Sequence, residues 1–151
     1  MGRPERYVKD QLSKNLRGKG IRARGFVFTV GYSGKKFEGL ARVLTENKIQ
    51  VLVDVRRFPS SKYPEFTLES LTKELHKLGI EYVHIEGLGG FRGGYKSYMG
   101  QESFKAAFEV LLRVVRTRQS CLMCREALSK YCHRRFIARK LLELGFKIID
   151  V

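Results

Sequence analysis

One short segment of the chain, from Cys124 to Arg134, contains five side chains that are common in catalytic and binding sites. They are Cys124, Glu126, Cys132, His133 and Arg134. The segment follows an apolar, strand-like run over 120–123 and precedes a helix-like run over 136–144. Reactive side chains between a strand and the following helix occupy the usual ligand crevice of an α/β sheet. The segment therefore predicts a functional site, and its other members must come from other strand ends.

Apolar runs of two kinds alternate along the chain and must position that site. Strands are expected over 26–30, 51–55, 82–85, 121–123 and 146–151. Helical spacing of apolar residues spans 37–44, 68–78, 104–115 and 134–144, with Thr67 as a helix cap, Gly79 as a helix end and a glycine-rich loop over 87–100. This alternation predicts a single doubly wound, Rossmann-like α/β domain with a mostly parallel five-stranded sheet.

The α/β pattern covers residues 26–151 and leaves a basic N-terminal extension over residues 1–25. Residues 1–24 contain eight basic and two acidic side chains. Such a segment is either a solvated terminal extension or an arm that contacts phosphates.

The charge of the chain points to a polyanionic partner. Thirty Lys and Arg residues against 15 Asp and Glu give a formal net charge of +15. An excess of this size is typical of proteins that bind nucleic acid or nucleotides. No apolar run is long enough to span a bilayer, and the N-terminus lacks the apolar core of a secretory signal. We therefore expect a cytoplasmic protein with no membrane association, and its oligomeric state stays open.

Polar side chains follow the other expected strands as well. Tyr32 and Ser33 come after the first strand, and Asp54 and Arg56 come at the end of the second. The carboxyl ends of parallel strands share one edge of a sheet, so these residues are expected beside the 124–134 segment. Asp54 is either a structural carboxylate that caps a turn or pairs with Arg56, or a catalytic carboxylate in a crevice of low dielectric constant.

Two further interpretations concern anions and thiols. Arg56, His133 and Arg134 are candidate phosphate ligands, since the last two begin a helix whose N-terminus favours an anion. Cys124 is either a buried small hydrophobic residue or a nucleophile with a lowered pKa. A phosphatase loop would need Arg at position 130, where the chain has Lys130.

A zinc site is the less favoured alternative to a site without a cofactor. Its candidate ligands are Cys121, Cys124, Cys132 and His133. His84 and Glu86 followed by the Cys121/Cys124 pair also resemble the zinc deaminase pattern, although Ser120 replaces its proline. Against zinc, the odd spacing of Cys121 and Cys124 in an extended run directs their side chains to opposite faces.

Four motifs in order resemble the family called domain of unknown function 488. They are Gly31-Tyr32-Ser33, the run from Asp54 to Pro59, Leu88-Gly89-Gly90, and the pattern from Cys124 through Cys132-His133-Arg134. The resemblance covers about residues 26–151, with Tyr32 where the family usually has His. It implies a fold and a site, but no established reaction.

The preferred hypothesis is an enzyme that acts on nucleic acid or nucleotides, such as a hydrolase of N-glycosidic bonds that excises bases. Asp54 or Glu126 would stabilise the sugar cation or activate water, Arg56 and Arg134 would bind phosphate, and Tyr32 would stack on a base. Two alternatives stay open. One is a non-catalytic nucleic-acid-binding (DNA-binding) module, and the other is a thiol- or zinc-dependent enzyme that uses Cys124.

Overall fold

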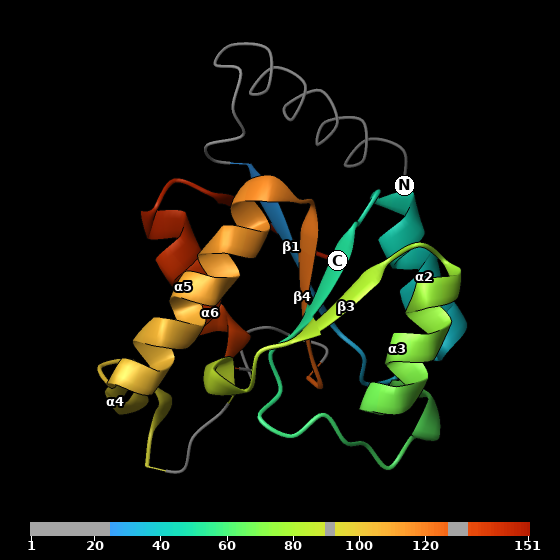
Figure 1. The fold of residues 1–151 in the computed structure, drawn as a ribbon, viewed down its shortest axis with the longest axis horizontal. Helices are drawn as coiled ribbons and strands as arrows, with labels where there is room; N and C mark the ends of the chain where they lie inside the picture. The colour runs from blue at the N-terminus through green and yellow to red at the C-terminus, as the bar shows by residue number, and fades with distance from the viewer. Residues whose placement is uncertain (1–24, 90–92, 127–132) are drawn as a thin grey trace.

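The computed structural model describes residues 25–89, 93–126 and 133–151, and within them five strands form one parallel sheet. The strands are β1 (Phe26–Gly31), β2 (Val51–Asp54), β3 (Glu81–His84), β4 (Ser120–Cys124) and β5 (Lys147–Asp150). Their order across the sheet is β3-β2-β4-β1-β5, and every pairing is parallel (Figure 1). The predicted α/β fold with a five-stranded sheet is confirmed.

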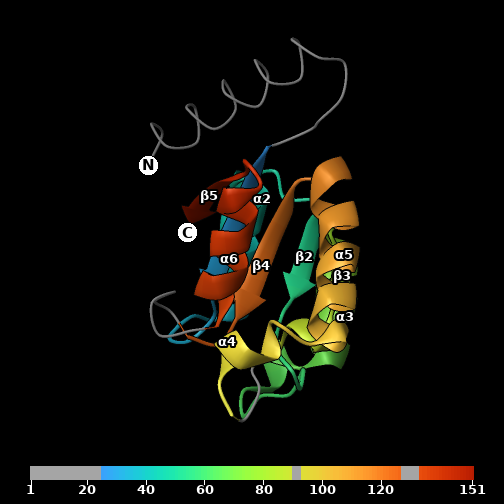
Figure 2. The ribbon, with the colours of Figure 1, turned by 90° about the vertical axis from the view of Figure 1, so that its left-hand side faces the viewer.

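Helices cover both faces of the sheet. On one face lie α2 (Phe37–Glu46) and α3 (Leu68–Lys77), and on the other lie α5 (Glu102–Thr117) and α6 (Arg134–Glu143) (Figures 1 and 2). Shorter helical segments are η1 (Pro64–Phe66), η2 (Glu86–Leu88) and α4 (Tyr95–Tyr98). No helix in the described ranges is both long enough and apolar enough to span a membrane.

The alternation of side chains along the strands divides the core into two clusters. In β1, Phe26 and Phe28 pack with α2 and α3, whereas Val27 packs with α5 and α6. In β4, Cys121 lies in the first cluster and Cys124 in the second. Because both faces of the sheet are covered, its central strands read as continuous apolar runs in the sequence.

Thr67 and Gly79 bound α3 as predicted. The Ser70 amide donates to the Thr67 side chain at 3.4 Å, and Gly79 has a φ of +74° after the helix. The expected loop over 87–100, however, contains η2 and α4. Its tyrosines explain the difference, since Tyr95 and Tyr98 are buried and donate hydrogen bonds to the Leu88 and Gly87 carbonyls, both at 2.8 Å. Such tertiary contacts leave no periodicity in a segment this short.

The connections leave the sheet on opposite faces at β4. The chain passes from β1 to β2 and from β2 to β3 by way of α2 and α3 on one face. It returns from β3 to β4 and continues to β5 by way of α5 and α6 on the other. Strand β4 lies between β1 and β2, and the loop at its carboxyl end turns to the opposite face of the sheet from the loops that follow β1 and β2. A sheet of this kind binds its ligand at such a reversal.

Candidate functional site

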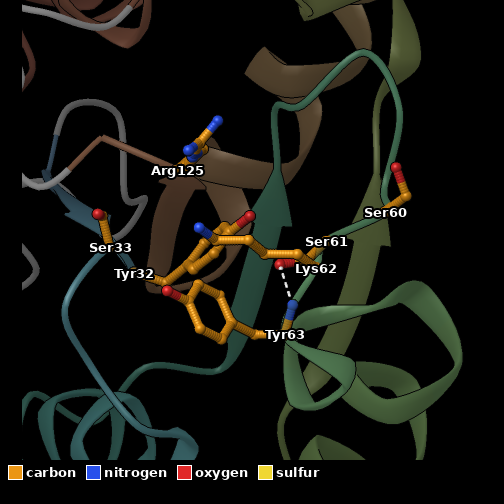
Figure 3. A pocket seen from close by; sticks show the side chains of 7 residues that line it. All are labelled: Tyr32, Ser33, Ser60, Ser61, Lys62, Tyr63 and Arg125. Atoms are coloured by element: carbon orange, nitrogen blue, oxygen red, sulfur yellow. Dashed lines mark hydrogen bonds between the residues drawn. The ribbon is translucent and has the colours of Figure 1, made fainter.

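A pocket of about 440 Å³ opens at this reversal. It is lined by seven residues from three strand exits, namely Tyr32, Ser33, Ser60, Ser61, Lys62, Tyr63 and Arg125 (Figure 3). Tyr32 and Ser33 follow β1, Arg125 follows β4, and the rest belong to the β2–α3 loop, residues 55–67. Of these seven described residues, two are cationic and none is a carboxylate. The pocket therefore favours an anionic ligand.

Backbone pairing beyond the strand ends places two of the lining residues opposite each other. The Tyr32 amide donates to the Cys124 carbonyl at 3.1 Å, and the Ser33 amide donates to the Arg125 carbonyl at 2.8 Å. These bonds extend the pairing of β1 with β4 by two residues. The Ser33 hydroxyl and the Arg125 guanidinium thus come from adjacent positions on the pocket rim.

Asp54, at the end of β2, is fully buried in a cluster with Arg56 and Tyr82 that we call the Asp54 cluster. The Arg56 Nε donates to Asp54 Oδ1 at 2.9 Å, and its Nη2 donates to Oδ2 at 2.7 Å. The Arg56 backbone amide also donates to Oδ1 at 3.0 Å, and the Tyr82 hydroxyl donates to Oδ2. A carboxylate with four donors and no exposed surface favours the structural interpretation of Asp54.

The ionisation of the Asp54 cluster agrees with this interpretation. Burial would lower the pKa of Arg56, but hydrogen bonds to Asp54 and its negative charge outweigh burial and raise that pKa above its ordinary value. Burial, reinforced by the Asp54 charge, raises the pKa of Tyr82 above its ordinary value. Arg56 therefore stays cationic and Tyr82 stays protonated, as their hydrogen bonds to a carboxylate require.

The remaining donor group of Arg56 fixes the β2–α3 loop. Its Nη1 donates to the Phe66 carbonyl at 2.8 Å and to the Ser60 carbonyl at 3.3 Å. The same Nη1 lies 3.4 Å from the Tyr32 hydroxyl, and the Tyr32 ring stacks on Phe66 with centroids 4.4 Å apart. Arg56 thus contacts two residues of the pocket lining, Tyr32 and Ser60, and both Arg56 and Tyr32 are almost fully buried.

Two histidines fix the start of the same loop. The His133 Nε2 lies 2.8 Å from the Val55 carbonyl, and the His84 Nε2 lies 2.7 Å from the Arg56 carbonyl. A carbonyl can only accept, so Nε2 carries the hydrogen in both rings. Burial lowers the pKa of His133 from its ordinary value, which favours the neutral ring. A neutral imidazole in this position suits a structural donor better than a phosphate ligand.

Gly89 of the Leu-Gly-Gly motif packs directly against the loop. A Cβ built at Gly89 would lie 2.2 Å from the Arg57 Cα and 2.3 Å from its backbone nitrogen. The absence of a side chain at position 89 is thus a steric requirement for the path of the loop. The motif serves to position the loop that lines the pocket.

Arg134 anchors the exit of β4 from within the interior. Its side chain is fully buried, and Nη1 donates to the Glu126 carbonyl at 2.6 Å and lies 2.9 Å from the Cys124 sulfur. Its Nη2 donates to Asp150 at 3.3 Å. Arg134 is therefore not among the residues that line the pocket. Its predicted phosphate contact remains untested.

The other residues of the predicted site differ in accessibility. Cys124 is buried and disulfide-bonded, so thiol chemistry there requires prior reduction. Glu126 is half-buried and directly follows the pocket residue Arg125. Of the eight predicted site residues, Tyr32 and Ser33 line the pocket, and Glu126 is the carboxylate that retains access to solvent.

The positions of Cys121 and Cys124 do not fit the zinc alternative. Cys121 and Cys124 lie in core clusters on opposite faces of the sheet, as their spacing predicted, so one ion cannot bind both sulfurs. Cys121 is a buried free thiol whose pKa is raised by burial. No cluster of potential metal ligands occurs among the described residues. Cys132 and the extension over residues 1–24 lie outside them.

Sequence reasoning missed five of the seven pocket residues, namely Ser60, Ser61, Lys62, Tyr63 and Arg125. Asp54 and Arg56 have residue types typical of a catalytic site, so the sequence points to them and not to the loop that they support. A usable signal was present, because Lys62 and Tyr63 put a cation and an aromatic ring side by side a few residues after Pro59. Arg125 directly follows a buried strand.

Comparison with known proteins identifies the chain at the level of a family. The sequence model of the family described as "Domain of unknown function DUF488" matches residues 36–94 and 89–141. The match begins after β1, so the Gly31-Tyr32-Ser33 motif lies outside it. Neither the search of curated proteins nor the search of solved structures returned a match. Because the family match spans most of the chain, including the Asp54 and Leu-Gly-Gly motifs and the exit of β4, the chain belongs to the DUF488 family.

Proposed function

We propose that the pocket at the exits of β1, β2 and β4 binds the phosphate of a nucleotide unit, either free or within a nucleic acid. The observation that carries the proposal is the composition of the pocket wall. Lys62 and Arg125 supply two cations, Ser33, Ser60 and Ser61 supply hydroxyls, and Tyr63 supplies a half-exposed ring. Cations with hydroxyl donors suit a phosphate, and a ring beside them suits a base.

The charge of the whole chain supports the same proposal. A net charge of +15 attracts a polyanion over a long range, and the pocket offers the local contacts. Internal hydrogen bonds engage the side chains of Asp54, Arg56 and Arg134. We therefore assign the phosphate contacts to Lys62 and Arg125, in place of Arg56 and Arg134, which the sequence suggested.

The test compares ligands that differ only in phosphate. Calorimetric titration with a 5′-mononucleotide and with the matching nucleoside should give measurable binding for the nucleotide alone. Lys62→Gln and Arg125→Gln should each weaken nucleotide binding about 10- to 100-fold, the loss expected for a charge-assisted hydrogen bond. Lys48→Gln is the control, since Lys48 is an exposed lysine before β2, at the opposite edge of the sheet. Equal binding of nucleoside and nucleotide would refute the proposal.

Hydrolysis of an N-glycosidic bond is a second candidate, favoured by the position of Glu126 next to Arg125. In this reaction Glu126 accepts a proton from water, the water oxygen bonds to the anomeric carbon, and the base leaves with the electron pair of the broken C–N bond and takes up a proton from solvent, to which Glu126 then releases its own. Glu126→Gln should abolish base release while leaving nucleotide affinity within about twofold, whereas a non-catalytic module would show no base release in either protein.

A further inference from the structure

We infer that the β2–α3 loop is a stacking surface for unpaired bases, so that the ligand of this protein is single-stranded nucleic acid. The inference rests on the proposed function, because the same loop lines the phosphate pocket. It adds a substrate class that the pocket alone does not specify.

The first observation is where exposed aromatic rings occur. Six large hydrophobic side chains are exposed among the described residues, and two of them are aromatic. These two are Phe58, at 68% exposure, and Tyr63, at 48%, and both lie on the β2–α3 loop. Because the exposed rings of the described residues fall on the loop that lines the pocket, this loop is the candidate surface for a partner.

The second observation is that each ring has a cation beside it. The Arg57 guanidinium carbon lies 5.9 Å from the centre of the Phe58 ring, and the Lys62 Nζ lies 5.2 Å from the centre of the Tyr63 ring. A ring paired with a cation can stack on a base while the cation approaches the adjoining phosphate. Proteins that bind single strands without sequence preference combine these two kinds of contact.

The third observation is that the loop is fixed although its rings are exposed. The Arg56 Nη1 bonds to the Ser60 and Phe66 carbonyls, and Gly89 packs against the Arg57 backbone. The Leu68 amide also donates to the Pro59 carbonyl at 3.0 Å. A loop held at this many points loses little conformational entropy when it binds, which strengthens association.

These observations favour unpaired bases over duplex and over lipid. In a duplex the base faces are covered by neighbouring base pairs, so protruding rings have nothing to stack on. A lipid surface would also accept a phenylalanine flanked by cations. However, the adjoining pocket offers Ser33, Ser60 and Ser61 hydroxyls, which suit polar recognition of a sugar and phosphate better than insertion among acyl chains.

The experiment measures fluorescence anisotropy of a labelled 12-nucleotide single strand and of the matching duplex, each titrated with the full chain at several salt concentrations. The variants are Phe58→Leu and Tyr63→Leu, which keep apolar bulk and net charge but remove the ring. Leu78→Ala is the control, because Leu78 is 44% exposed and follows α3 at the opposite edge of the sheet. Sedimentation with anionic phospholipid vesicles is measured in parallel.

We expect the single strand to bind more tightly than the duplex, and each ring variant to weaken single-strand binding by at least about fivefold, the loss expected for one stacked base. The slope of affinity against salt should not change in these variants, since they remove no charge. Three results would each overturn the inference: equal affinity for duplex and single strand, wild-type affinity in both ring variants, or vesicle binding that a single strand does not displace. If one of these results is found while Lys62→Gln still weakens nucleotide binding, the stacking inference fails but the proposed phosphate-binding function stands.

Discussion

Replacing Arg56 by methionine separates a structural role from a ligand-binding role for the Asp54 cluster. The substitution keeps most of the aliphatic volume and removes the guanidinium. Asp54 would then stay fully buried with the backbone amide of position 56 and the Tyr82 hydroxyl as donors. The Phe66 and Ser60 carbonyls would lose their contact with Nη1.

The expected loss of stability is large because one charge of a buried pair stays behind. Removing a single partner from such a pair costs about 3–5 kcal/mol. For a domain of this size, each kcal/mol lowers the melting temperature by roughly 2–4 °C, so the variant should melt roughly 6–20 °C below the wild type. Arg118→Met is the control, since Arg118 pairs with Glu81 in an ion pair that is partly exposed, and should cost no more than about 1 kcal/mol.

Urea denaturation and calorimetric melting measure both effects. A double variant, Asp54→Leu with Arg56→Met, should lose less free energy of unfolding than the sum of the two single variants, by about 0.5–3 kcal/mol, because it leaves no unpaired charge. A melting temperature within about 2 °C of wild type for Arg56→Met, together with complete loss of nucleotide binding, would contradict a structural role for Arg56. Arg56 would then be a ligand-binding residue.

Three further predictions follow from contacts around the pocket. Because burial lowers the pKa of His133 below 6.5, the unfolded chain binds this proton more readily, so the free energy of unfolding should fall as pH drops from about 7 to 5. His133→Gln, which keeps a donor toward the Val55 carbonyl, should show a flatter pH dependence in urea titrations, and an unchanged slope would contradict the assignment. Gly89→Ala should lower stability by about 1–3 kcal/mol through its clash with Arg57, whereas Gly39→Ala in α2, with nothing within 4 Å, should raise it by up to about 1 kcal/mol. Once base release is measured with the protein reduced, so that Cys124 is a thiol in the wild type, Cys124→Ser should keep most of that activity and Glu126→Gln should lose most of it, and the reverse order would favour thiol chemistry.

The strands and long helices were predictable because their signals are local. Apolar runs such as 26–30 and helical spacing such as 104–115 need no knowledge of the rest of the chain. The sequence also indicated that the strand ends share one edge of the sheet, because the carboxyl ends of parallel strands lie together. The short helix α4 was not predictable, because its Tyr95 ring packs against His133 and Phe136 from a distant part of the chain.

The roles of individual residues at that edge were less predictable. Asp54 and Arg56 have the residue types of a catalytic site, and the sequence cannot show that each satisfies the other in the interior. Lys62 and Tyr63 resemble ordinary loop residues until the fixed path of the loop brings them to the same pocket as Arg125. Solvent accessibility separates the buried pair, Asp54 and Arg56, from the pocket residues, and it depends on the whole fold.

The phosphate-binding pocket is tested most directly by an amide NMR titration of the ¹⁵N-labelled full chain with a 5′-mononucleotide. We expect shift changes concentrated at the pocket residues Ser33, Ser61, Lys62, Tyr63 and Arg125. Amides at the opposite edge of the sheet, at Gly79 and Gly145, should stay unchanged. Shift changes spread evenly over the basic surface, or centred on that opposite edge, would contradict a phosphate-binding pocket at the exits of β1, β2 and β4.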